Sequence, residues 1–274
     1  SKPSPSARTA NTIATSARAL PASGGAACTA NNYVMIGNST KSFSGTFDGR
    51  GHTISGLYNY GSNIYCSSLF ANVDGGTVRN VGIINSYISG GMHVGGVAGY
   101  LLDNGLVENC YCDSSVSIIG NSYGIAGIVG YCNSSTVHYC YNNGSIRGEG
   151  DADYFGGITG EIVGENSLVQ CCYNTGTVSP AKNYHGAGGI TGLLSSGNTL
   201  RNCYNTGAVS GLGDCYGGIV GYNLGTIQYC YNAALVSGTS YVGNIAGLSS
   251  YVTGGISGCY YDSDVCSIGG IRGS

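Results

Sequence analysis

Cysteine is the residue type with the most evident chemistry in this chain of 274 residues, which contains 13 of them. No two cysteines have the Cys-x-x-Cys spacing of structural zinc sites, so we predict no metal and no cofactor. A thiol count this high is typical of proteins in an oxidising compartment outside the cytoplasm. Six cysteines recur at regular intervals, each directly before a tyrosine: Cys110, Cys140, Cys172, Cys203, Cys230 and Cys259.

Two arrangements suit these six cysteines if consecutive repeats stack at the ~4.8 Å spacing of neighbouring strands. The Cα atoms would then be close enough for disulfides, first of all Cys110–Cys140, Cys172–Cys203 and Cys230–Cys259. The alternative is a ladder of buried thiols that act as small hydrophobic side chains. The cysteine count favours some disulfides, and its odd value leaves at least one thiol unpaired within the chain.

Histidines and carboxylates are the other candidates for acid–base chemistry. The four histidines lie in different segments without the arrangement of a catalytic triad: His52, His93, His138 and His185. Polysaccharide-cleaving enzymes use paired carboxylates. The acids that lie close in sequence are Asp103 with Glu108 and Asp113, Asp151 with Asp153, Glu161 with Glu165, and Asp262 with Asp264. No acid recurs from repeat to repeat, so we expect solvated loop carboxylates and no catalytic residues.

Asparagine and tyrosine offer surface chemistry. Asn38, Asn133 and Asn143 begin Asn-x-Ser/Thr sequons, which are N-glycosylation acceptors in an exported protein from a suitable source. A tyrosine follows each of the six regular cysteines, and this aromatic stripe would either stack on sugar rings or stabilise the wall of the fold. Its presence in every unit favours the structural role.

Composition excludes several classes of protein. Charged residues make up 8% of the chain and the net charge is −3, against ~25% charged residues in average soluble domains. Disordered chains are highly charged, and nucleic-acid-binding proteins carry basic patches, so neither class is expected. No apolar run approaches the ~20 residues of a membrane-spanning helix, so no membrane span is expected.

The elements that must position these side chains are set by an internal repeat. A Gly-Gly-Ile-x-Gly-like anchor ends at Gly99 and recurs after 31, 30, 32, 29 and 26 residues, at Gly130, Gly160, Gly192, Gly221 and Gly247. A second anchor contains the Cys-Tyr pair. A third short apolar segment closes each unit near Val116, Ile146, Val178, Val209, Val236 and Val265.

Each unit therefore contains three short β-type segments separated by Gly, Asn, Ser or Thr, and no helical periodicity. One such unit cannot bury its apolar side alone, but stacked units can. We predict an all-β, single-stranded parallel β-helix of about seven to eight coils of roughly 30 residues, right-handed because parallel crossovers are. Aligned Val/Ile and Cys columns would face inward. A column of Asn142, Asn174, Asn205 and Asn232 would form an amide ladder.

The anchors Gly-Gly-Ile-x-Gly and Asn-Cys-Tyr-Asn-Thr-Gly-x-Val-Ser resemble the GLUG-motif repeats of bacterial surface and secreted proteins. The segment at 43–57 is similar to the one that often precedes such arrays. The resemblance covers about residues 41–274 and implies a β-helical, adhesin-like repeat protein of the cell surface or the extracellular space. It implies little about activity, and the additional cysteines depart from the family pattern.

We therefore expect a Ser/Ala/Pro-rich arm or linker with an entry segment at 1–40 and a repeat domain at 41–274. The first anchor begins again at 268–273, which suggests end-to-end self-association or a longer array. The predicted function is a non-catalytic extracellular structural protein, a stalk or filament subunit of a microbial surface with adhesive contacts to glycans or a host surface. The alternative is a carbohydrate-binding or polysaccharide-cleaving β-helix protein.

Overall fold

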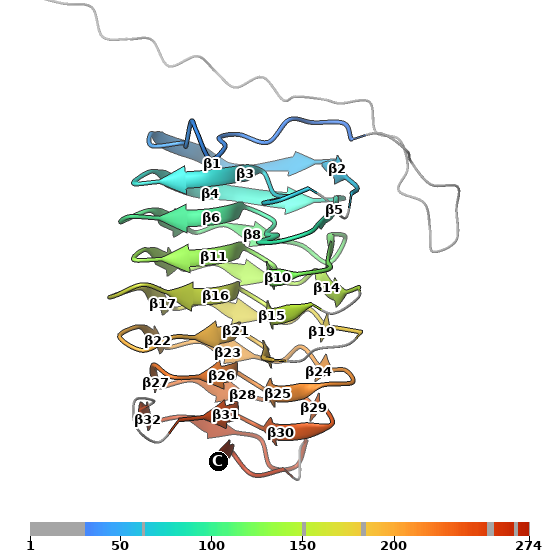
Figure 1. The fold of residues 1–274 in the computed structure, drawn as a ribbon, viewed down its shortest axis with the longest axis vertical. Coiled ribbons are helices and arrows are strands. Elements are labelled where there is room, and N and C mark those ends of the chain that lie inside the picture. The colour runs from blue at the N-terminus through green and yellow to red at the C-terminus, as the bar shows by residue number, and fades with distance from the viewer. Residues whose placement is uncertain are drawn as a thin grey trace, which may run out of the picture.

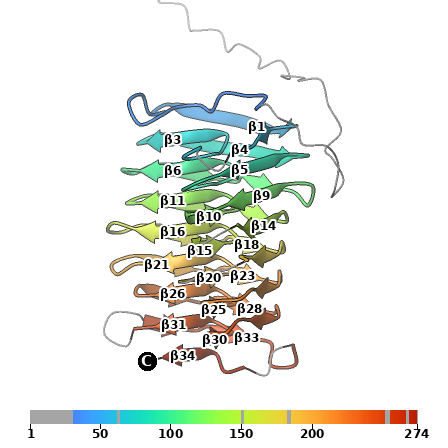
Figure 2. The same ribbon diagram turned by 45° about the vertical axis from the view of Figure 1, so that its right-hand side comes forward.

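The computed structural model describes residues 31–61, 64–149, 152–181, 185–250, 255–265 and 268–273. All regular elements in these ranges are β-strands, and successive coils, about seven in number, stack along one axis (Figures 1 and 2). The predicted all-β parallel β-helix is confirmed, whereas its handedness stays a prediction. Residues 1–30, most of the predicted arm, lie outside the described residues. Ile36 and Phe43 already bridge to Phe70 and Val73 of the first coils.

Four parallel sheets, here called A to D, form the walls, and one coil passes through sheets C, D, A and B in turn. Sheet A contains β3 (Phe70–Asp74), β6 (Ala98–Leu102), β11 (Val129–Asn133), β16 (Thr159–Val163), β21 (Thr191–Leu194), β26 (Val220–Asn223), β31 (Ala246–Ser249) and β34 (Ile271–Gly273). Sheet D contains β10 (Tyr123–Ala126), β15 (Asp153–Gly156), β20 (Ala187–Gly188), β25 (Asp214–Gly217) and β30 (Ser240–Gly243).

Sheet B is bent, and β4 (Thr77–Ile84) runs through both of its halves beside β1 (Thr46–Ser55). One half contains β7 (Leu106–Glu108), β12 (Thr136–His138), β17 (Leu168–Gln170), β22 (Thr199–Arg201), β27 (Thr226–Gln228) and β32 (Gly255–Ser257). The other half contains β8 (Tyr111–Cys112), β13 (Tyr141–Asn142), β18 (Tyr173–Asn174), β23 (Tyr204–Asn205), β28 (Tyr231–Asn232) and β33 (Tyr260–Tyr261).

Sheet C contains β2 (Tyr58–Asn59), β5 (Tyr87–Gly90), β9 (Ser117–Gly120), β14 (Ser145–Gly148), β19 (Val178–Ser179), β24 (Val209–Ser210) and β29 (Val236–Ser237). The third predicted segment of each repeat is this sheet. In the first copy, the residue in register with Ile146 is Ile118 rather than Val116. Val265, expected to face inward, lies outside the strands and is 42% exposed.

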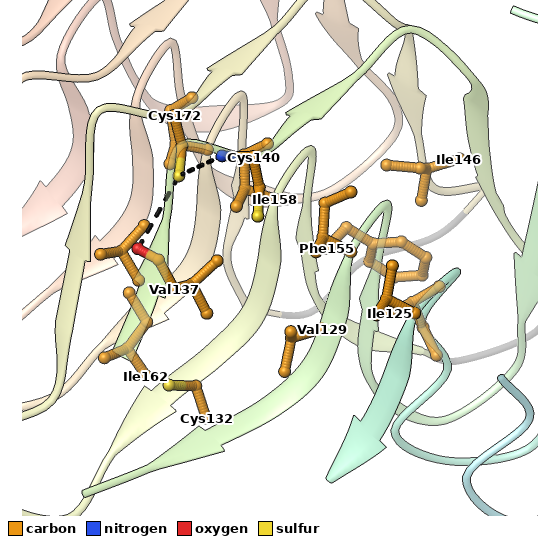
Figure 3. Packing of buried hydrophobic residues seen from close by; sticks show 14 of the residues in the cluster. Ile125, Val129, Cys132, Val137, Cys140, Ile146, Phe155, Ile158, Ile162 and Cys172 are labelled. Carbon is orange, nitrogen blue, oxygen red and sulfur yellow. Dashed lines mark hydrogen bonds between the residues drawn. The ribbon is translucent and has the colours of Figure 1, made fainter. Parts of the chain in front are cut away.

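The interior is filled by aligned apolar columns, as the repeat predicts. In sheet B, every coil contributes one fully buried residue to a column: Val107, Val137, Val169, Leu200 and Ile227. Larger side chains such as Phe155 and Ile125 fill the space near sheet D (Figure 3). Full burial of one such side chain contributes about 1.5–3 kcal/mol to folding, so this core is the main source of stability.

The predicted asparagine ladder is present and completely buried. The Nδ2 group of Asn142 donates to Oδ1 of Asn174 at 2.9 Å, and the same bond continues to Asn205 and Asn232 at 2.9 and 3.0 Å. Each Nδ2 also donates to a carbonyl two residues further along the chain. Buried polar groups are costly unless bonded, and this ladder satisfies both amide protons.

The second glycine of the Gly-Gly anchor makes room for this ladder. A Cβ atom on Gly157 would lie 2.3 Å from Cγ of Asn174, and one on Gly189 would lie equally close to Asn205. A contact this short is not tolerated, so only glycine fits. The two sequence anchors therefore face each other across the interior and form one packing unit.

Residues in the left-handed backbone region also form columns. One column lies where sheet D approaches sheet A and has φ between 50° and 76°: Cys66, His93, Gly124, Tyr154, Gly186, Cys215 and Tyr241. The other lies at the bend of sheet B and has φ between 50° and 61°: Asn80, Asn109, Tyr139, Cys171, Asn202, Tyr229 and Gly258. Non-glycine residues rarely adopt this conformation, so the stacked coils impose it.

The Gly189→Ala substitution tests the packing unit. We expect it to lower the free energy of unfolding by about 1–3 kcal/mol, the usual cost of overpacking, because the added methyl group meets the Asn205 amide. Urea unfolding followed by circular dichroism measures the effect. The matched control is Gly255→Ala, where the nearest atom would lie 4.0 Å away; equal losses in the two variants would contradict the packing unit.

Candidate functional site

The six regular cysteines form one internal column of free thiols. Five of them are at most 2% exposed, and Cys259 is partly exposed. The backbone N–H groups of Cys110, Cys140 and Cys230 donate to Sγ of the cysteine in the following coil at 3.4 to 3.5 Å, and Figure 3 shows the bond from Cys140 to Cys172. Each Sγ also lies 3.1 to 3.4 Å from the carbonyl oxygen two residues earlier.

The predicted disulfides Cys110–Cys140, Cys172–Cys203 and Cys230–Cys259 are not formed in this structure. Register explains the difference, because in-register parallel strands hold equivalent Cβ atoms ~4.8 Å apart, whereas a disulfide needs ~3.8 Å. Burial raises the pKa of the nearby Cys132 thiol to about 12. Hydrogen bonding to Cys140, together with burial, raises the pKa of Cys110. The arrangement is the thiol ladder, the alternative weighed above.

The tyrosines that follow these cysteines stack on each other. The ring centroids of Tyr111, Tyr141, Tyr173 and Tyr204 are 4.7 to 4.9 Å apart, and neighbouring rings are parallel within 4°. The Tyr111 ring begins this stack over Gly82, where a Cβ atom would lie 2.2 Å from the ring. The ring faces are therefore covered by one another, and the edges and hydroxyl groups face solvent. Stacking of these four rings stabilises the wall and covers the faces between them, whereas Tyr231 and Tyr260 further along the stripe are 41% and 71% exposed.

A buried acid–base pair, which the sequence did not predict, lies where sheets D and A meet. The Nε2 atom of His93 is 3.3 Å from Oε1 of Glu161, and both side chains are about one-tenth exposed. The His93 ring packs between Tyr100 and Tyr131, with centroid distances of 4.6 and 4.8 Å. A buried charge is costly unless it is paired, so the two side chains depend on each other.

Gly124 creates the space for this pair. Its φ is +69°, and a Cβ atom there would lie 2.6 Å from the His93 ring and 2.9 Å from the Glu161 carboxylate. The Nδ1 atom of His93 and Oε1 of Glu161 are both buried and lack a hydrogen bond. Burial, with Cys66, Tyr131 and Glu161 nearby, raises the pKa of Tyr100 to about 12. Two of the four polar atoms of this pair are thus closed off from solvent, and the side chains as a whole keep about one-tenth of their surface exposed.

The sequence contained one signal for this pair. In the repeat, Glu161 stands in register with Tyr100 and Tyr131 on one side and with Leu193 and Tyr222 on the other. A carboxylate in a column of large apolar side chains is unusual and indicates a partner. His93 was not identified as that partner because β16 is two strands along sheet A from β6, the strand that follows the histidine.

The structure does not bring the predicted carboxylate groups together into a catalytic site. Glu165 is exposed on the turn after β16, away from its sequence neighbour Glu161. Asp153 is buried and accepts the backbone N–H of His185 at 2.9 Å. Oε1 of Glu108 lies 3.7 Å from Nδ1 of His138 on the outer face of sheet B. Asp151 lies outside the described residues. Among the described residues, no group of three or more His, Cys, Asp or Glu side chains is arranged to hold a metal ion.

The predicted glycosylation sites differ in exposure. Asn38 is exposed, and its Oδ1 accepts hydrogen bonds from the backbone and hydroxyl groups of Thr40. Asn133 and Asn143 are half-buried, and Oδ1 of Asn143 accepts a hydrogen bond from Thr175 at 2.7 Å. Glycosylation at the three sites stays a prediction. No helix in the described part of the chain has the length and apolar character to cross a membrane.

Comparisons with known proteins identify a similar fold. No protein-family model matches the chain, and no curated protein matches it. Among solved structures, the chain is similar to a crystal structure named as a "putative immunoglobulin A1 protease" from Bacteroides ovatus. The TM-score is 0.62 and the sequence identity 24%, over 86% of this chain and 75% of the other. This similarity shows that the two chains share a β-helical repeat fold.

A double-mutant cycle tests the buried pair. His93→Ala should lower the free energy of unfolding by about 3–5 kcal/mol because it leaves the Glu161 charge buried without a partner. The double variant His93→Ala with Glu161→Leu should lose less than the sum of the single losses. Urea unfolding gives all values. The control pair is the more exposed His138 with Glu108, where His138→Ala should cost at most about 1 kcal/mol; additive losses at His93 and Glu161 would disprove the coupling.

Alkylation tests the thiol ladder. Because the six thiols are unpaired and all but Cys259 are buried, we expect slow labelling of the five buried thiols by iodoacetamide in the native protein and faster labelling of Cys259. After unfolding without reductant, all six should be labelled, as shown by peptide mass spectrometry. Recovery of a disulfide-linked peptide pair, such as Cys110 with Cys140, would instead support the covalent alternative.

Proposed function

We propose that this chain is a non-catalytic structural protein of a microbial surface, a β-helical stalk or a self-stacking filament subunit with adhesive contacts. The observation that supports this best is the continuity of the side-chain columns. Valine, cysteine, asparagine and tyrosine recur in register over successive coils, so that each coil presents nearly the same surface to the next. Such a solenoid is a spacer of constant cross-section, and further coils can extend it without a new kind of interface.

The chemistry of the described residues is consistent with a non-catalytic role. Nδ1 of His93 and Oε1 of Glu161 are buried, and the two side chains are only about one-tenth exposed. A catalytic acid or base must come within hydrogen-bond reach of its substrate, and exposure this small does not favour such a contact. The protease name of the solved structure refers to that protein, and the identity between the chains is too low to transfer an activity.

The proposed location is extracellular or at the cell surface. The resemblance to GLUG-motif repeats supports this location. The proposed partners are further copies of the same repeat array, and glycans or a host surface. Nucleic acid and a membrane span are not part of the proposal.

Electron microscopy tests the filament form of this function. At rising protein concentration, negative-stain images should show rods that lengthen by end-to-end addition, because each coil is complementary to its neighbour. Sedimentation velocity should show a matching rise in mass. Short rods of one fixed length at every concentration would exclude self-stacking, and the stalk would then be the remaining form of the proposed function. Turnover of any member of a polysaccharide panel would overturn the non-catalytic assignment in favour of the polysaccharide-cleaving alternative.

A further inference from the structure

A hollow on the outer face of sheet C has a lining unlike the rest of the surface. The register of β5, β9 and β14 places Ser89, Ile119 and Arg147 in one column, and Tyr60 directly follows β2, which pairs with β5. The small serine between Tyr60 and Ile119 leaves a gap in this column. Together with the backbone of Gly90 and Gly120, it forms a cavity of about 250 Å³.

Three tyrosines gather at one end of this hollow. The Tyr58 and Tyr87 rings stack with centroids 5.4 Å apart and an angle of 20° between them. The ring centroids of Tyr60 and Tyr87 are 6.3 Å apart, and the two ring planes form an angle of 33°. Tyr60 is 58% exposed. Tyr60 is the exposed member of this group and lines the cavity.

The polar groups of the hollow lie at its floor and rim. Ser89 is at the floor, and Asn121 and the exposed carboxylate of Glu149 complete the lining. Arg147 is on β14 and Glu149 directly follows that strand. Their opposite charges therefore lie close together in the chain and sum to zero. Burial, with the Glu149 carboxylate nearby, raises the pKa of Tyr87, which indicates that the acid is within electrostatic reach of the tyrosine cluster.

We propose that this hollow binds one pyranose ring of a neutral polysaccharide. The apolar C–H face of a sugar packs on an aromatic ring such as Tyr60, and its hydroxyl groups bond to the Glu149 carboxylate, the Asn121 amide and the Ser89 hydroxyl. The cavity is smaller than the ~300–1,000 Å³ of ordinary ligand pockets, so it holds a single ring while adjoining rings lie on the surface. The local charge balance favours a neutral sugar over an anionic one.

This inference rests on the adhesive part of the proposed function and names its partner. The test is isothermal titration calorimetry and saturation-transfer NMR with a panel of neutral hexasaccharides: maltohexaose, cellohexaose and mannohexaose. At least one member should bind. Tyr60→Ala and Asn121→Ala should each weaken that binding by at least about tenfold, equivalent to ~1.4 kcal/mol. The control is Tyr231→Ala, which removes a tyrosine 41% exposed on sheet B and should not change binding.

Two results would overturn the site. One is failure of every neutral hexasaccharide to bind, including the case in which only an oligogalacturonate binds. The other is binding that the Tyr60 and Asn121 variants retain and the Tyr231 variant loses. Circular dichroism verifies the fold of each variant, and Asn121→Ala tests the site independently if Tyr60→Ala does not fold. If electron microscopy shows rods but no sugar binds, the sugar site is disproved and the structural function still stands.

Discussion

The contact between a glycine of one wall and an asparagine of the opposite wall is the constraint on which the coil depends. Gly157 and Gly189 lie so close to the amides of Asn174 and Asn205 that a single methyl group would not fit. This approach brings the walls together at one place and lets the amides bond to each other along the axis. The valine, isoleucine and cysteine columns are buried in the same interior.

Much of the fold was predictable because stacking converts a repeat in sequence into a column in space. The glycine anchors, the Asn column and the inward Val and Cys positions could be aligned by eye, and the structure places them as aligned. The same logic was less reliable where a repeat is irregular. Val116 was chosen over Ile118, and Val265 was counted as internal, because the third segment lacks an invariant glycine or tyrosine to fix its register.

The candidate site was harder to predict for two physical reasons. The His93–Glu161 contact joins different positions of different coils, so no spacing within one repeat reveals it. Disulfide formation was inferred from the Cα spacing together with the high cysteine count. The direction of the side chains decides it, since in-register strands point equivalent Cβ atoms the same way rather than toward each other. The tyrosine stripe shows a similar effect, because stacking of the rings on each other removes the faces that a sugar would use.

The gap at Gly124 has a consequence for how the chain finds its alignment during folding. In a strict repeat, a register shifted by one whole coil would be as stable as the correct one, because valine would again contact valine and asparagine would contact asparagine. The residues that break the repeat make the shifted register less stable. In this column glycine occurs at Gly124, beside the His93 ring, and at Gly186, beside the Tyr154 ring, and Glu161 replaces an apolar residue in register with Tyr131. Buried polar partners are known to specify register in this way. The irregular residues thus help to determine which coil stacks on which.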